Sequence, residues 1–147
     1  YSLFWIVTFF TIGHTFSLYI STYGIYNPDL NIIEFLIPIT ILFSAVSNLI
    51  LKVQVKKSSL SYSVSLLFGL IHGFGFAGFY DQITFSDKIE FTPLIGFTIG
   101  VEIAQIIIVF FVLLLSTILN SRRNFFSKNF IKIMSILICL LTILIFF

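Results

Sequence analysis

The sequence predicts an all-α membrane protein, a polytopic bundle with five visible transmembrane helices. Apolar residues make up 59% of the 147 residues and charged residues only 10%, and the mean hydropathy is +1.13. These values lie far outside the range of soluble domains. The apolar residues are grouped in segments of about 20, the length that a helix needs to cross roughly 30 Å of hydrocarbon. We therefore expect a single transmembrane helical domain over residues 1–147.

Five segments are long enough to form such helices. In chain order they cover about residues 1–23, 33–51, 62–80, 92–119 and 130–147. The third segment is the least hydrophobic, because glycines, serines and His72 dilute it, but its length and polar flanks favour a span. The single Cys139 lies in the last segment without a partner, so we expect neither a disulfide nor a cysteine metal site.

Basic residues gather in two of the four loops. Residues 52–61 and 120–132 hold seven of the eight Lys and Arg, whereas the other two loops hold only Lys88 together with five of the six acids. The positive-inside rule places the two basic loops in the cytoplasm, so the fifth span finishes outside.

The chain opens directly in membrane sequence, with YSLFWIVTFF and without an initiator Met, a basic segment or a signal-peptide cleavage site. We expect an N-terminally truncated sequence, with six transmembrane helices in the full-length protein.

Residues 73–78 read GFGFAG, a literal match to the GxGxxG fingerprint of dinucleotide-binding folds. That fingerprint requires a preceding strand, a following crossover helix and an acid about 20 residues further on. Here it lies inside an apolar segment of helical length, so we expect no nucleotide cofactor. The glycines instead belong to two helical ladders, Gly69, Gly73, Ala77 and Gly96, Gly100, Ala104. Such small faces let helices approach closely, and we expect the third and fourth spans to pack through at least one of them.

Three ionisable side chains lie deep within the predicted spans, namely His14, His72 and Glu102. Inserting a charged side chain at the centre of a membrane-spanning helix costs about 2.5 to 3.5 kcal/mol, so such groups usually face a bundle interior or water. His14 shares one helix face with Ser17 and Ser21, at spacings i, i+3 and i+7. This pattern is typical both of a functional polar face and of hydrogen bonds that only hold helices together.

Glu102 shares a stripe of its helix with Thr98 and Gln105. No Lys or Arg lies deep in a span to pair with this carboxylate, so a histidine, a metal ion or a proton is left as its partner. Imidazole suits nickel, cobalt, copper and zinc, a carboxylate supplies charge, and an amide oxygen can complete a loose site. We therefore expect His14, His72 and Glu102 to converge in the outer half of the membrane, with Gln105 as a further ligand.

Four sequence blocks, TFFTIGHTFSL, EFLIPITILFSAVSNLI, LFGLIHGFGFAGF and FTIGVEIAQIIIVF, occur in this order. Over about residues 8–112 they resemble the HupE/UreJ family of bacterial membrane proteins. Members are described as hydrogenase or urease accessory proteins and as nickel or cobalt permeases. The resemblance implies metal uptake or metal delivery in the inner (cytoplasmic) membrane, and no enzyme. His14, His72, Glu102 and Gln105 fall on family motif positions.

The resemblance also implies possible partners and leaves other functions open. Besides the lipid bilayer, a metalloenzyme-maturation protein or another membrane complex is an expected partner, and nucleic acid is not. Family members commonly begin with a further span carrying a GxDHxLF motif, which this sequence lacks. The main alternative is a non-transporting structural or accessory subunit. An intramembrane metal-dependent hydrolase is a third, although the sequence offers no HExxH pair and no third histidine.

Overall fold

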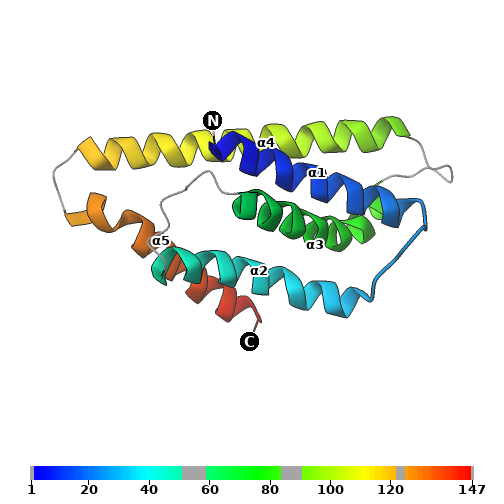
Figure 1. The fold of residues 1–147 in the computed structure, drawn as a ribbon, viewed down its shortest axis with the longest axis horizontal. Coiled ribbons are helices and arrows are strands. Elements are labelled where there is room, and N and C mark those ends of the chain that lie inside the picture. The colour runs from blue at the N-terminus through cyan, green and yellow to red at the C-terminus, as the bar shows by residue number, and fades with distance from the viewer. Residues whose placement is uncertain (1, 51–58, 84–90, 122–124, 147) are drawn as a thin grey trace. The chain divides into compact units, whose positions relative to one another are not determined.

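Five long helices make up the part of the chain that the structure, a computed structural model, describes: residues 2–50, 59–83, 91–121 and 125–146. The helices, in chain order (Figure 1), are α1 Ser2–Thr22, α2 Leu30–Ile50, α3 Ser59–Ile83, α4 Phe91–Ser121 and α5 Phe125–Phe146. Each is long and apolar enough to cross a membrane. The predicted all-α fold class is confirmed, and the helices match the predicted spans closely, except that α5 begins at Phe125 rather than at residue 130.

A tight turn joins α1 to α2. Gly24 ends α1 with a φ of 66°, a conformation that costs glycine little because it has no side chain. The N–H groups of Gly24 and Ile25 donate to the carbonyls of Ser21 and Ile20, which is the hydrogen-bond pattern of a Schellman motif. Asp29 then caps α2, since its Oδ1 accepts a hydrogen bond from the Asn31 N–H at 2.9 Å.

Contacts within the chain fall into two units, and α2 and α4 contribute to both. The first unit contains Tyr1–Ile37 and Val55–Gln105, and the second contains Pro38–Gln54 and Ile106–Phe147. The first unit carries every residue singled out as a candidate ligand, so the site can be described within it.

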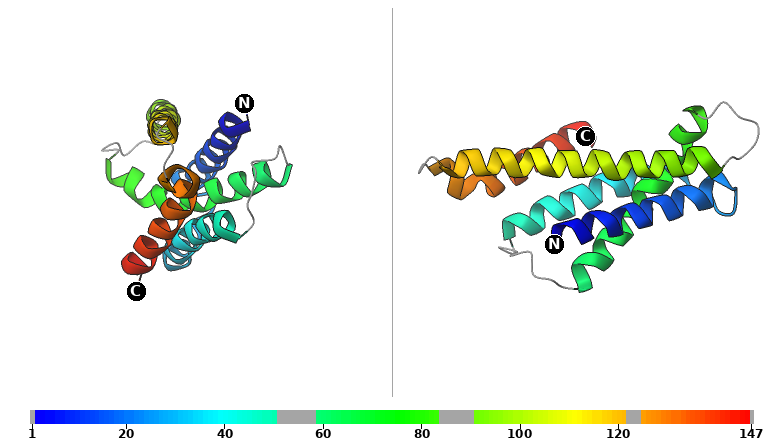
Figure 2. Two further views of the ribbon diagram at one scale, coloured as in Figure 1. Left: turned by 90° about the vertical axis from the view of Figure 1, so that its left-hand side faces the viewer. Right: turned by 90° about the horizontal axis from the view of Figure 1, so that it is seen from above.

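Helices α1 and α3 cross in direct backbone contact (Figure 1, Figure 2). A Cβ atom on Gly69 would overlap the carbonyl oxygen of Phe10, and one on Gly73 would overlap that of His14. On the other helix, a Cβ on Gly13 would overlap the carbonyl oxygen of Leu66. No side-chain rotation can relieve an overlap with backbone, so these three glycines set the distance between the helices.

The glycine ladder of α3 is therefore used for close packing, but its glycines meet α1 rather than α4. Contact with α4 involves Ala77 at the end of the ladder, which joins a buried apolar cluster with Leu18 and Leu94. The corresponding ladder of α4 is open: within the described ranges, no heavy atom lies within 4 Å of a Cβ built on Gly96 or Gly100.

Small side chains fill the buried positions of the second unit. Its buried residues include Thr40, Ala45, Ser135 and Thr142. The hydroxyl of Thr142 donates to the Ile138 carbonyl of its own helix at 2.8 Å, so its burial leaves no polar group unsatisfied. This arrangement is what helix packing in lipid requires, where small residues allow close approach.

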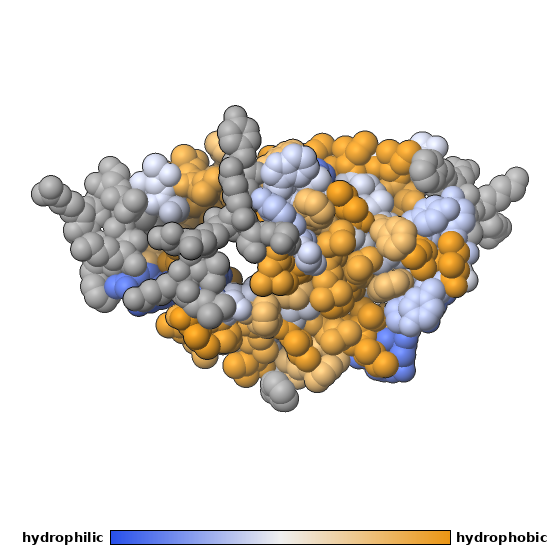
Figure 3. Space-filling view, in the orientation of Figure 1, coloured by the Kyte–Doolittle hydropathy of each residue, from blue (hydrophilic) through white to orange (hydrophobic). Residues whose placement is uncertain are grey.

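The surface of the helices is strongly apolar. Apolar side chains, orange in Figure 3, cover most of the face shown. On α4, Phe110, Phe111 and Leu113 each expose more than half of their surface. Exposed apolar area of this extent is unfavourable in water and favourable against lipid, in agreement with a membrane protein.

The backbone contact between α1 and α3 at Gly69 can be tested by substitution. We expect Gly69→Ala to lower the free energy of unfolding by about 1–3 kcal/mol, the usual cost of overpacking. Gly100→Ala introduces the same methyl group on an open helix face, so it should change this free energy by less than about 0.5 kcal/mol. Reversible unfolding in mixed detergent micelles measures both. Equal effects of the two substitutions would show that α1 and α3 are not in backbone contact.

Candidate functional site

His72 of α3 is held in a defined orientation by its own helix. Its Nδ1 lies 2.8 Å from the carbonyl oxygen of Phe68, one turn earlier. A carbonyl can only accept, so Nδ1 carries the proton and donates it. The other ring nitrogen, Nε2, is left with a lone pair that can bind a metal ion or accept a hydrogen bond.

His14 of α1 is buried, with only 6% of its surface exposed, and aromatic rings surround its imidazole. Its ring centroid lies 6.2 Å from that of Phe10, 5.9 Å from that of Phe76 and 6.1 Å from that of Phe97. These three rings come from α1, α3 and α4. The imidazole therefore stands where three helices of the first unit meet, in surroundings that favour its neutral form because charge is costly away from water.

The α1–α3 contact brings the two histidines together. Phe10 lies beside both rings, with its centroid 5.4 Å from that of His72. Gly73, the residue after His72, packs on the carbonyl of His14. Both histidines therefore border Phe10 at the α1–α3 contact, and we refer to His14 and His72 as the histidine pair.

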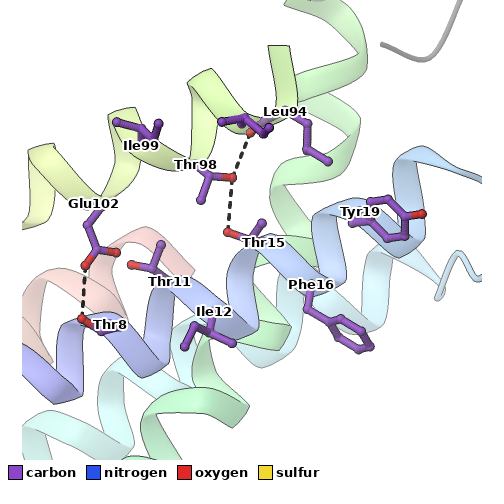
Figure 4. A pocket seen from close by; sticks show the side chains of 11 residues that line it. Thr8, Thr11, Ile12, Thr15, Phe16, Tyr19, Leu94, Thr98, Ile99 and Glu102 are labelled. Carbon is purple, nitrogen blue, oxygen red and sulfur yellow. Dashed lines mark hydrogen bonds between the residues drawn. The ribbon is translucent and has the colours of Figure 1, made fainter. Parts of the chain in front are cut away.

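Glu102 and Gln105 of α4 meet threonines of α1 instead, and Figure 4 shows the contact of Glu102 with Thr8. The Thr8 hydroxyl donates to Oε1 of Glu102 at 3.2 Å, and the Thr11 hydroxyl lies 2.9 Å from Oε1 of Gln105. A third bond joins the same helices: Thr15 donates to Thr98 at 3.3 Å. These bonds form a polar contact between α1 and α4 across an otherwise apolar surface.

A cavity of about 570 Å³ lies beside this polar contact, between α1 and α4. Its α1 wall consists of Thr8, Thr11, Ile12, Thr15, Phe16 and Tyr19. Its α4 wall runs from Leu94 to Glu102 (Figure 4). Of the lining residues that the structure describes, Glu102 alone carries a formal charge, and none is basic.

The four predicted site residues therefore form two groups rather than one. His14 and His72 lie together at α1 and α3, while Glu102 and Gln105 face the α1 threonines. Within the described ranges, no three His, Cys, Asp or Glu side chains are placed so that they could hold a metal ion. The two histidines and Glu102 do not form such a group: Thr8, the partner of Glu102, lies six residues before His14 on α1, about 120° around the helix.

Comparison with known proteins gives a family match over the whole chain. A model of the HupE / UreJ protein family matches residues 1–147. The chain belongs to the HupE/UreJ family. No curated protein and no solved structure gives a significant match to it. The family prediction is confirmed, and the match extends beyond residues 8–112 to both ends of the sequence. The family implies an accessory or permease-type function connected with nickel or cobalt.

Sequence reasoning missed three polar residues of this HupE/UreJ protein: Thr8, Thr11 and Thr15. Their spacing of i, i+3 and i+7 is the same pattern that singled out His14, Ser17 and Ser21, so a search for hydroxyl stripes on the first span would have found them. A threonine in a transmembrane helix can always bond its own backbone, as Thr11 does with the Val7 carbonyl at 3.2 Å, and this makes the pattern weak evidence from sequence alone.

The contact between Thr11 and Gln105 of the HupE/UreJ protein can be measured by a double-mutant cycle. We expect Thr11→Val and Gln105→Leu to be coupled by about 0.6 kcal/mol, the average for hydrogen bonds between membrane helices. As a control, Thr117→Val with Gln105→Leu should show no coupling, because among the described residues the Thr117 hydroxyl donates to the Leu113 carbonyl of its own helix. Unfolding in mixed micelles gives the four free energies. Zero coupling for the Thr11 pair would contradict the contact.

Proposed function

We propose that this HupE/UreJ protein is a permease or delivery protein for a divalent metal ion, nickel or cobalt, with His14 and His72 as its nitrogen ligands. The observation that carries this proposal is the hydrogen bond from His72 Nδ1 to the Phe68 carbonyl. Histidines that bind metals in proteins almost always donate their other ring N–H to a carbonyl or carboxylate, which fixes the ring and raises its basicity. His72 has this arrangement.

The chemistry of the pair suits transient binding. Imidazole nitrogens bind nickel and cobalt well. Structural metal sites are usually closed by four protein ligands, whereas two imidazoles leave several coordination positions to water. An ion held in this way exchanges readily, as transport or delivery to a partner requires.

Glu102 and Gln105 add oxygen ligands on the other side of α1. Phe97, from the same helix as Glu102, stacks on His14 at 6.1 Å, so α4 borders the histidine pair as well as the threonines. In the proposed function the ion is the substrate. The metal ion binds to the nitrogen ligands at α1 and α3, and the negative charge of Glu102 compensates part of the positive charge of the ion.

The proposed location is the bacterial inner membrane, with the basic loops 52–61 and 120–132 in the cytoplasm. This orientation rests on the positive-inside rule, because residues 52–58 and 122–124 of these loops lie outside the described part of the chain. A metalloenzyme-maturation protein at the cytoplasmic face is the proposed partner.

A specific observation favours the second candidate, a non-transporting accessory subunit. Glu102 and Gln105 each contact a threonine hydroxyl of α1, which is all that a helix-packing role needs. In this case the four polar residues would stabilise the bundle, and the loops would dock a partner.

Nickel or cobalt uptake by membrane vesicles distinguishes the two functions. For a permease, we expect His72→Ala and Glu102→Gln to reduce uptake at least about tenfold, the lower limit for disturbing a metal site. Glu34→Gln, which alters an exposed acid of α2, should leave uptake unchanged. Unchanged uptake in both site variants, with a lowered melting temperature in detergent, would favour the accessory subunit.

A further inference from the structure

We propose that the cavity between α1 and α4 binds a lipophilic organic cation, with Glu102 as its counter-ion. The chemical class is a quaternary ammonium, a phosphonium or an amine with large apolar substituents. This binding site is separate from the histidine pair but shares Glu102 with the proposed metal transport, so its test is made without any metal ion.

The size of the cavity suits an organic molecule better than a hydrated metal ion. Its volume of about 570 Å³ lies within the range of roughly 300–1,000 Å³ that is usual for small-molecule sites. An ion with six waters needs only about 180 Å³, at about 30 Å³ for each water. The cavity offers about three times that volume, which is enough for an organic molecule.

The walls favour apolar substituents. Ile12, Phe16, Leu94, Ile95 and Ile99 supply apolar surface. The hydroxyls beside them are already engaged: Thr15 donates to Thr98, and Thr98 donates to the Leu94 carbonyl at 2.8 Å. The water molecules around a hydrated ion would find few free hydrogen-bond partners on such walls, whereas hydrocarbon groups need none.

The charge of the lining selects a cation. Glu102 is the one charged residue among the described lining residues, and its only hydrogen-bond donor given by the structure is the neutral Thr8 hydroxyl. The remaining titratable group of the lining is Tyr19, further along α1 (Figure 4). A carboxylate away from bulk water attracts a cation strongly. A large organic cation loses less hydration energy on entering the membrane than a small ion does, because its charge is spread over a larger radius.

The cavity is also elongated in the direction of the helices. Its α1 wall extends from Thr8 to Tyr19, which lie eleven positions apart and so span about 16 Å at 1.5 Å per residue. A cationic centre beside Glu102 thus leaves length for an apolar body along Ile12 and Phe16. An acyl chain of a lipid would fit the apolar part, but it would make no use of the carboxylate.

Binding of radiolabelled tetraphenylphosphonium to the purified full chain in detergent, without added metal, tests this proposal. We expect saturable binding, weakened at least tenfold in Glu102→Gln and unchanged in Glu34→Gln, which removes an exposed carboxylate outside the cavity. Triphenylphosphine oxide, an uncharged compound with similar aromatic groups, should not compete.

A second variant keeps the test valid if Glu102→Gln does not fold. Ile99→Trp fills the cavity without changing its charge, so it should also weaken binding at least tenfold while the melting temperature in detergent stays near that of the unaltered chain. Absence of saturable binding would overturn the proposal. So would binding that persists in Glu102→Gln or in Ile99→Trp, or that the uncharged compound displaces, because each result indicates an apolar occupant such as a lipid chain or a site elsewhere.

Discussion

The backbone contact between α1 and α3 is the constraint on which the site depends. Helices in lipid gain little from burying apolar side chains, because lipid is equally apolar, so they associate through close packing and hydrogen bonds. Gly13, Gly69 and Gly73 remove the side chains that would keep the two backbones apart. The close approach places Phe10 beside both His14 and His72. Any bulkier residue at these glycines would separate the imidazoles.

Helix α1 then divides the polar chemistry of the first unit between two sides. Toward α3 it presents Phe10, which lies beside both His14 and His72. Toward α4 it presents threonines, which meet Glu102 and Gln105. The proposed nitrogen and oxygen ligands therefore lie on different sides of one helix, next to a cavity of about 570 Å³. This separation is compatible with two cation sites of different chemistry, one for a transition metal and one for an organic cation.

Much of the fold could be predicted from the sequence, because the length and composition of the apolar segments determine which residues form membrane helices. The glycine ladder around Gly73 was also predictable as a packing face, and the apparent dinucleotide fingerprint lies inside the continuous helix α3. The helix that packs against this face was not predictable, because the spacing of the glycines identifies a face of α3 but not the helix that lies against it. Likewise, the depth of His14 and Glu102 in their spans follows from residue counts. Whether the two side chains meet at one site depends on how each helix is rotated about its axis, which residue counts do not give.

Pulsed electron paramagnetic resonance of Cu²⁺ bound to the purified chain tests the histidine pair most directly. Copper binds imidazole more strongly than nickel or cobalt does, and its spectrum reports how many imidazoles coordinate it. The proposed function predicts two imidazole ligands in the unaltered chain, one in His14→Ala or His72→Ala, and loss of the paired signal in Gly73→Leu, which forces α1 and α3 apart. A single imidazole in the unaltered chain, or two in Gly73→Leu, would contradict the glycine-held pair.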